Sequence, residues 1–284
     1  MVFYCLFLKQ MKKNPIGIFD SGYGGLTVMK EIVALLPQYD YIYLGDNARA
    51  PYGPLPFETV YDYTLECVKW FFSQGCSLVI LACNTASAKA LRNIQQKDLP
   101  NIDTSKRVLG VIRPTSELIG NFTKTNHVGI MATQGTVASQ SYVIETEKFF
   151  PQIKVTQEAC PEWVNLVENG QHLSLESDKS VQKHLNNILR KDENIDCILL
   201  ACTHYPLLRE TINKHVPKNV AVIEQGKIVA ESLVIYLEKH PEMAEKCSKN
   251  GKQTFFTTGN ANDFDSHASL FFGNEISSTQ IKLS

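Results

Sequence analysis

The sequence lacks three features that would place it in other classes of protein. No apolar run approaches the ~18–20 residues that cross a membrane. The 28 basic residues, set against 29 acidic ones, form no block that would attract nucleic acid or an anionic membrane. The 8 cysteines include no Cys-x-x-Cys pair, which argues against a zinc ribbon or a disulfide framework. We therefore expect a globular cytoplasmic protein that binds neither nucleic acid nor membranes.

The N-terminal segment also lacks the marks of a signal peptide. Residues 1–10 are rich in apolar side chains, but no basic region precedes them and no small-residue cleavage site follows. Met11 stands just before the first predicted strand. We interpret residues 1–14 as an N-terminal extension, to which the sequence assigns no role.

Strand-like and helix-like segments alternate along most of the chain, which is typical of β-α-β units around parallel sheets. The 284 residues suffice for two α/β domains. We expect the first domain to comprise 15–105 and 218–284, and the second to comprise 106–217. Strands are predicted at 16–19, 41–44, 78–82, 107–112, 127–131, 153–156, 195–201 and 220–223, with a closing region around 255–259.

Two of the predicted strand ends are near copies of each other. Each is an apolar run that ends in Leu-Ala-Cys, at Cys83 and at Cys202, and small polar residues follow. The segments 17–21 and 129–133 also match in order, and the same offset aligns Asp46 with Glu158. We interpret these matches as a duplication that gives two similar domains, related by a pseudo-twofold axis, with one cysteine in each.

The paired cysteines indicate proton transfer at a carbon atom. The carboxyl ends of parallel strands bind ligands, so two thiols there can face opposite sides of one small molecule. A single buried cysteine is usually inert, but two in matching contexts favour function. His204 can hydrogen-bond or deprotonate Cys202. No second pair at ligand spacing accompanies Cys202 and His204, so we expect no metal.

Other candidates lie at neighbouring turns. Asp20 precedes a glycine-rich turn that lacks the third glycine of a dinucleotide fingerprint, and it can serve either the site or a helix cap. Glu158 can orient His204 or act on the second thiol, or be a solvated strand-end residue. The loop 45–54, which contains Tyr52, can grip a carboxylate or form a rigid surface loop. Donors that can hold a zwitterion at helix N-termini are Asn84, Thr85, Thr203 and His204.

Together these motifs resemble the cofactor-independent aspartate/glutamate racemase superfamily over residues 16 to about 275. The motifs are Phe-Asp20-Ser-Gly-x-Gly-Gly-Leu-Thr, Gly-Asp46-x-Ala-Arg-x-Pro-Tyr52-Gly53, Ala-Cys83-Asn-Thr-Ala-Ser, Glu158-x-Cys-Pro and Cys202-Thr-His204-Tyr-Pro. The resemblance implies an active site in the cleft between the domains and no cofactor. It implies Cys83 and Cys202 as the proton-transfer groups, with Asp20, Glu158 and His204 in support. Implied substrate contacts are Asp20, Ser21, Tyr52, Gly53, Asn84, Thr85, Thr203 and His204.

The function that the resemblance implies is interconversion of L- and D-glutamate, which supplies D-glutamate for peptidoglycan. We further expect a homodimer. Racemisation of aspartate, isomerisation or decarboxylation of a related diacid, and sensing of a small acid without turnover remain alternatives. The sequence departs from the family pattern at Tyr23 and at 224–226, where Glu-Gln-Gly replaces a more usual strand end that contains Asp.

Overall fold

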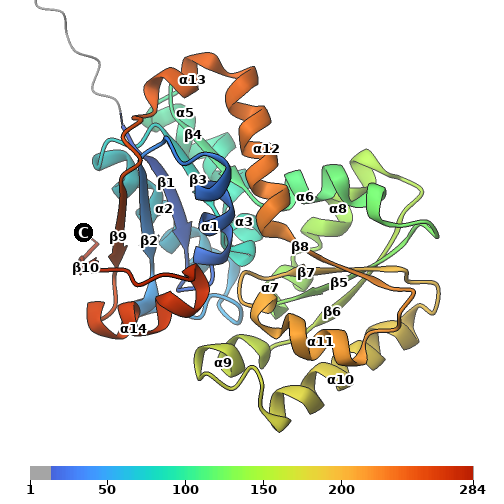
Figure 1. Cartoon of the computed structure of the whole chain (residues 1–284). Coiled ribbons are helices and arrows are strands. Elements are labelled where there is room, and N and C mark those ends of the chain that lie inside the picture. The colour runs from blue at the N-terminus through green and yellow to red at the C-terminus, as the bar shows by residue number, and fades with distance from the viewer. Residues whose placement is uncertain (1–13, 284) are drawn as a thin grey trace, which may run out of the picture.

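The computed structural model describes residues 14–283 and contains two parallel β-sheets flanked by helices (Figure 1). The predicted extension, apart from Asn14, lies outside the described residues. One sheet has the strand order β10-β9-β2-β1-β3-β4 and the other has the order β6-β5-β7-β8. The strands are β1 Ile16–Asp20, β2 Tyr41–Gly45, β3 Leu78–Leu81, β4 Arg107–Gly110, β5 His127–Ala132, β6 Lys154–Ala159, β7 Cys197–Ala201, β8 Ala221–Glu224, β9 Gln253–Thr257 and β10 Ser278–Gln280.

Helices connect the parallel strands, as crossover connections require. They are α1 Leu26–Leu35, α2 Phe57–Ser73, α3 Asn84–Lys89, α4 Leu91–Asn93, α5 Leu99–Ile102, α6 Ile112–Leu118, α7 Gln134–Ala138, α8 Ser141–Phe149, α9 Trp163–Glu168, α10 Leu175–Lys191, α11 Arg209–His215, α12 Gln225–Lys239, α13 Pro241–Lys246 and α14 Ala261–Phe272. Short turns of other helical types are η1 Asn47–Arg49, η2 Ile94–Asp98, η3 Ile119–Phe122 and η4 Tyr205–Leu208. None of the helices within residues 14–283 has the length and apolar character needed to span a bilayer.

The central strands are buried on both faces, which explains their continuous apolar runs. Every residue of β1, β2, β3 and β7 is buried. One hydrophobic cluster includes Ile18 and Met29 of the first domain together with Trp163 and Leu200 of the second. Each sheet also has a separate hydrophobic cluster of its own. The cluster in the first domain includes Phe71, and the other cluster lies mainly in the second domain. The domains therefore share one packed core beside the cleft.

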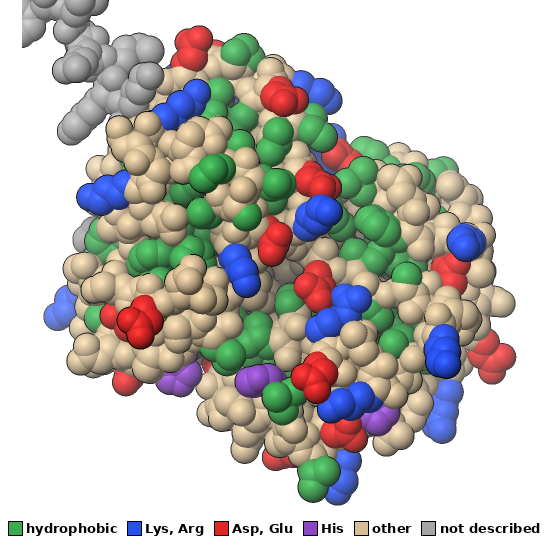
Figure 2. Space-filling view, viewed as in Figure 1, with side chains coloured by type: hydrophobic (Ala, Val, Ile, Leu, Met, Phe, Trp, Pro, Cys, Tyr) green, Lys and Arg blue, Asp and Glu red, His purple; other side chains and the backbone are tan. Residues whose placement is uncertain are grey.

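Acidic and basic side chains are interspersed on the face shown in Figure 2.

The two sheets confirm that the two domains are similar. The order β2-β1-β3-β4 in the first sheet is repeated as β6-β5-β7-β8 in the second. Leu81 pairs with Phe19 of β1, and Leu200 pairs with Met131 of β5, so Cys83 and Cys202 follow equivalent strands.

The alignment of Asp46 with Glu158 is wrong. The amide of Asp46 donates to the Asp20 carbonyl, and in the second domain the amide of Cys160 makes the equivalent bond to the Ala132 carbonyl. Cys160 is therefore the counterpart of Asp46. Glu158 lies two residues earlier, about 7 Å back from the strand end.

The predicted domain boundaries are also wrong at two strands. β4, assigned to the second domain, pairs with β3 of the first sheet, and β8, expected in the first domain, pairs with β7 of the second. The polar stretch before β4 misled the prediction, because it forms surface helical turns over 91–102 and not a linker. The predicted strand over 107–112 ends at Gly110, and α6 begins at Ile112. The closing strands β9 and β10 do return to the first sheet.

Candidate active site

A small cavity of about 30 Å³ lies between the two domains, where β1, β3 and β7 end. Both Cys83 and Cys202 line it, although they come from different sheets. The cavity has room for a few water molecules in this structure. The residues that line the cavity are Ser21, Ala50, Pro51, Tyr52, Gly53, Cys83, Asn84, Thr85, Thr133, Val164, Glu168, Cys202, Thr203 and His204.

Cys83 occupies the position just before α3, where helix amides point toward its sulfur. Its Sγ accepts a hydrogen bond from the Ala86 amide at 3.4 Å and lies 3.6 Å from the Ser21 hydroxyl oxygen. Burial raises the pKa of the Cys83 thiol to about 12, and the Asp20 carboxylate acts in the same direction. The helix amide only partly offsets these effects, so Cys83 is a neutral thiol near pH 7.

Cys202 has a different electrostatic environment from Cys83. His204 Nδ1 lies 3.9 Å from Cys202 Sγ, and His204 Nε2 lies 2.9 Å from Glu168 Oε1. Burial disfavours the imidazolium, but the contacts with Cys202 and Glu168 outweigh burial and raise the pKa of His204 to about 10. A cationic imidazolium beside sulfur favours the thiolate. The two sulfurs therefore differ in their surroundings: Cys83 lies near the buried Asp20 carboxylate, and Cys202 lies beside the His204 imidazolium.

Asp20 connects the two domains from behind the cavity. It is fully buried, its Oδ1 accepts a hydrogen bond from the Gly22 amide at 2.9 Å, and its Oδ2 accepts one from the Thr203 hydroxyl at 3.3 Å. Burial raises the pKa of Asp20, while the positive charge of His204 opposes that shift. Among the described residues, Asp20 is not one of those that line the cavity. Asp20 is linked to the cavity through Thr203, which lines it, and its predicted contact with substrate stays a prediction.

Gly24 allows the first turn to approach His204 closely. A Cβ atom at this position would lie 2.3 Å from Thr203 Oγ1 and 2.5 Å from His204 Nδ1, both well inside van der Waals contact. Any side chain here would push His204 away from the turn. The glycine-rich turn therefore serves contact between the domains.

The loop after β2 supplies the opposite wall of the cavity. Tyr52 is buried and donates its hydroxyl hydrogen to the carboxylate of Asp46, which also forms an ion pair with Arg49 at 2.7 Å. Burial raises the pKa of Tyr52, and Asp46 adds to the effect, so the phenol stays neutral. The sequence left two interpretations of this loop, a loop that binds a carboxylate and a rigid surface loop. The structure places it at the cavity. Thr85 lies 2.9 Å from Thr133 of the second domain, measured between the hydroxyl oxygens.

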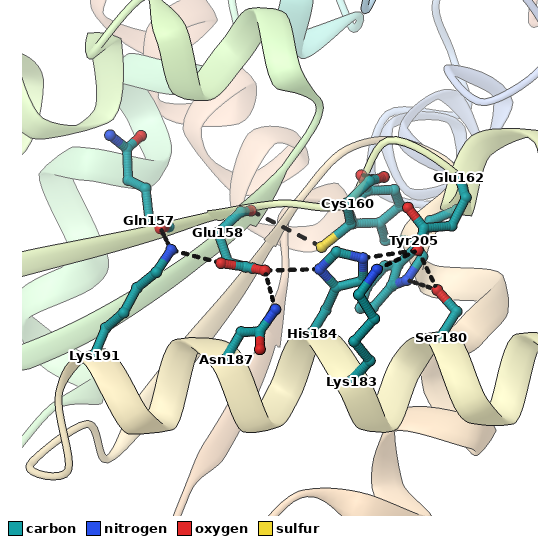
Figure 3. Close-up of polar contacts among 11 residues, drawn as sticks. Gln157, Glu158, Cys160, Glu162, Ser180, Lys183, His184, Asn187, Lys191 and Tyr205 are labelled. Atoms are coloured by element: carbon teal, nitrogen blue, oxygen red, sulfur yellow. Dashed lines mark hydrogen bonds and ion pairs between the residues drawn. The ribbon is translucent and has the colours of Figure 1, made fainter.

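Glu158 does not make the predicted contact with His204. Its carboxylate faces α10, where Oε1 contacts His184 Nδ1 at 2.7 Å and Asn187 Nδ2 at 3.0 Å, and Oε2 contacts Lys191 Nζ at 2.6 Å (Figure 3). His184 also contacts Glu162 Oε1 at 2.8 Å. Burial alone would raise the pKa of Glu158, but these partners lower it. Glu158 is thus part of a network that ties β6 to α10, because it lies too far back along the strand to reach the cleft.

Glu168 is the carboxylate that orients His204, and the sequence reasoning missed it. It is the last residue of α9 and lines the cavity. One signal could have identified it. A negative charge is unfavourable at the C-terminal end of a helix, where the backbone dipole is also negative. An acidic residue at this position, with no basic residue nearby in the sequence, therefore indicates a role other than helix stability.

The two departures from the family pattern lie beside the site. Tyr23 stacks on His267 and Phe271 of α14, with ring centroids 5.2 and 6.0 Å apart, and Phe271 packs edge-on against His204 at 5.3 Å. Glu224 pairs with Arg209 at 3.1 Å in a partly exposed ion pair. Tyr23 therefore supports the wall of the site through aromatic contacts. Among the described residues, the structure records no contact between Tyr23 and either thiol.

The fold and the site define a class: a two-domain α/β protein with one cysteine from each domain at a shared cavity. The sequence matches the family Asp/Glu/Hydantoin racemase over residues 16–233, and the chain belongs to this family. The glutamate racemase of Ruegeria sp. (strain TM1040) is 40% identical over 92% of this chain and 97% of its own. The glutamate racemase of Listeria monocytogenes serotype 4a (strain HCC23) is 37% identical over 89% and 91%.

Solved structures agree with the sequence relatives. Glutamate racemase isoform RacE1 from Bacillus anthracis matches with a TM-score of 0.86 and 33% identity, over 96% of this chain and 98% of that one. The enzyme from Francisella tularensis subsp. tularensis SCHU S4, in complex with D-glutamate, matches with a TM-score of 0.85 and 30% identity over the same shares. An aspartate racemase from Picrophilus torridus, at 18% identity and a TM-score of 0.52, shares only the fold.

Proposed function

We infer that this protein interconverts L- and D-glutamate by transferring a proton at the α-carbon, with Cys83 and Cys202 as the two transfer groups. The observation that carries this proposal is that equivalent strands of the two duplicated domains bring one thiol each to the same cavity. The relatives named glutamate racemase support glutamate as the substrate. D-Glutamate then supplies peptidoglycan synthesis.

The transfer needs one cysteine as a thiolate base and the other as a thiol that donates a proton. In the direction that begins at Cys202, whose sulfur lies 3.9 Å from His204 Nδ1, its thiolate takes the α-proton from one face of glutamate, which leaves a carbanion. The Cys83 thiol then gives its proton to the opposite face and becomes the thiolate. The reverse direction exchanges these roles, and proton exchange with solvent restores the resting pair after product leaves. Because the two cysteines interact electrostatically through the substrate, the pH profile of racemisation reflects both residues together and cannot be assigned to one of them.

Donors around the cavity fit a zwitterion with two carboxylates. Thr85, Thr203 and Asn84 come from the turns that follow the cysteine strands, and the backbone at Gly53 lies in the wall of the cavity. A carbanion beside a carboxylate gains stability from oriented donors of this kind. We assign substrate contacts to these residues and to Ser21, Tyr52 and His204.

The test is to incubate the purified protein with L-glutamate in D₂O and to follow circular dichroism and mass together. We expect the optical signal to decay to zero as deuterium enters the α-position of the product. Loss of the optical signal without label would contradict transfer through solvent-exchangeable thiols. Binding of glutamate without any loss of signal would instead indicate a sensor.

We also propose that the chain is cytoplasmic and forms a homodimer. A reducing compartment fits a site that needs two free thiols, and the cysteines 67, 76, 83, 160, 197, 202 and 247 are all unpaired. The family resemblance supports the dimer. Sedimentation equilibrium at enzyme concentrations used for the assay measures it directly, and a single monomeric species would contradict it.

A further inference from the structure

Three buried polar side chains form a closed cycle of hydrogen bonds behind Cys83. Asn84 Nδ2 donates to Gln225 Oε1 at 2.7 Å, Gln225 Nε2 donates to the Tyr142 hydroxyl at 2.5 Å, and that hydroxyl donates to Asn84 Oδ1 at 2.6 Å. The exposed fractions of Asn84, Gln225 and Tyr142 are 2%, 4% and 0%. Water therefore cannot substitute for a lost partner, and each bond strengthens the next.

The members of the Asn84–Gln225–Tyr142 cycle come from both domains. Asn84 begins α3 in the first domain and lines the cavity, while Tyr142 lies on α8 of the second. Gln225 is the first residue of α12, the helix that leads from the second sheet back to the first domain and packs along α1 (Figure 1). The cycle thus connects the cavity to the segment where the chain crosses between domains.

The direction of the cycle is fixed by α6. The Thr115 hydroxyl donates to the Val111 carbonyl at 2.8 Å, so its oxygen is left to accept from Gln225 Nε2 at 3.1 Å. The Val111 carbonyl, which accepts the Thr115 hydroxyl, also lies 3.5 Å from Gln225 Nε2. Gln225 must therefore turn its amide nitrogen toward α6 and its oxygen toward Asn84. This orientation in turn directs the nitrogen of Asn84 to Gln225 and its oxygen to Tyr142.

We propose that Gln225 is a positioning residue that holds Asn84 as a hydrogen-bond donor for the substrate carboxylate. The cycle occupies the oxygen of Asn84 and one of its two amide hydrogens, which leaves the second hydrogen for a ligand in the cavity that Asn84 lines. Without Gln225 the amide can rotate and present its oxygen, which repels a carboxylate. The proposal rests on the proposed glutamate racemase function.

The experiment compares Gln225→Met and Tyr142→Phe, which break the cycle at different atoms with little change in volume, and the double variant. Losing one hydrogen bond to a carboxylate should raise KM for glutamate about tenfold with a smaller change in kcat. Because both variants act through the same Asn84 amide, the double variant should also show a rise of about tenfold, where independent effects would multiply to about a hundredfold. The matched control is Tyr41→Phe, which removes the hydrogen bond from another buried tyrosine hydroxyl, to the Leu36 carbonyl at 2.8 Å, among residues that do not line the cavity. It should lower the melting temperature and leave KM within about twofold of the parent value.

A second measurement reads the cycle without turnover. In protein labelled with ¹⁵N-asparagine, the side-chain amide signal of Asn84, identified by its loss in Asn84→Asp, should exchange slowly with solvent. The exchange should become fast in Gln225→Met. An unchanged KM in both cycle variants, a hundredfold rise in the double variant, or fast exchange in the parent would each overturn the inference. A parent that fails to racemise glutamate would refute the proposed function instead, and the Asn84 signal would still decide whether the cycle exists.

Discussion

Replacing Glu168 by Gln tests the electrostatic account of the site most sharply. The substitution removes a negative charge 2.9 Å from His204 Nε2 and keeps the size of the side chain. Two unit charges about 4 Å apart interact by about 4 kcal/mol at an effective dielectric constant of 20. The Glu168 side chain is 24% exposed, so we take about half of that energy, or about 2 kcal/mol.

This energy converts into a displaced pH profile. About 2 kcal/mol corresponds to roughly 1.5 pH units, so the loss of the His204 proton should move from near pH 10 to roughly pH 8.5. The sign follows from the raised pKa: the cationic form is present at neutral pH and is lost as the pH rises. Relative to the parent, kcat/KM of Glu168→Gln should fall by less than about threefold at pH 7.5 and by about tenfold at pH 9.5.

The assay is racemisation followed by circular dichroism between pH 6.5 and 10.5. Dividing the parent's kcat/KM by that of the variant at each pH cancels titration of the substrate's own amino group. The matched control is Glu158→Gln, the same substitution at a carboxylate that faces α10, and it should leave the alkaline limb in place while lowering stability. An unmoved limb in Glu168→Gln, or a moved limb in Glu158→Gln, would refute the reasoning.

Three further predictions follow from single residues. Cys83→Ser and Cys202→Ser should each reduce racemisation by at least about a hundredfold, measured by circular dichroism, and near-full activity in either would exclude two-thiol transfer. Gly24→Ala should lower kcat/KM by about tenfold or more, because the new methyl group displaces His204; a crystal structure with His204 unmoved would contradict this cause. Asp192 is paired with His127 at 2.8 Å and Lys154 at 3.0 Å, and although burial opposes ionisation, these partners lower its pKa to about 2. Asp192→Asn should therefore cost about 2 kcal/mol of unfolding free energy at pH 7 and much less at pH 2, since this contribution is present above pH ~4 and is lost as the pH falls through about 2. An equal loss at both pH values in urea denaturation would be the contrary result.

The sequence by itself determined the strands and the two cysteines. Runs buried on both faces are continuous in apolar residues, so β1, β2, β3 and β7 can be found without a structure. The repeated Leu-Ala-Cys ending survives duplication because it serves the same strand position in each domain. Cys83 and Cys202 were therefore visible as a pair, and the closing strands were correctly expected to return to the first sheet.

Only the tertiary structure decided which carboxylate meets His204 and where the domains divide. Glu158 and Glu168 are both acids near the motif Cys-Pro, but one lies back along β6 against α10 and the other ends α9 at the cavity. Sequence spacing does not specify the direction of a side chain across a turn. β4 and β8 were each assigned to the wrong domain for a similar reason. The sheet of a strand is set by its hydrogen-bonded neighbour, and each of these strands pairs with the strand just before it in the chain. The difference between the two thiols could also be recognised only from the structure. The fold holds the His204 imidazolium beside Cys202 and brings the buried Asp20 carboxylate near Cys83.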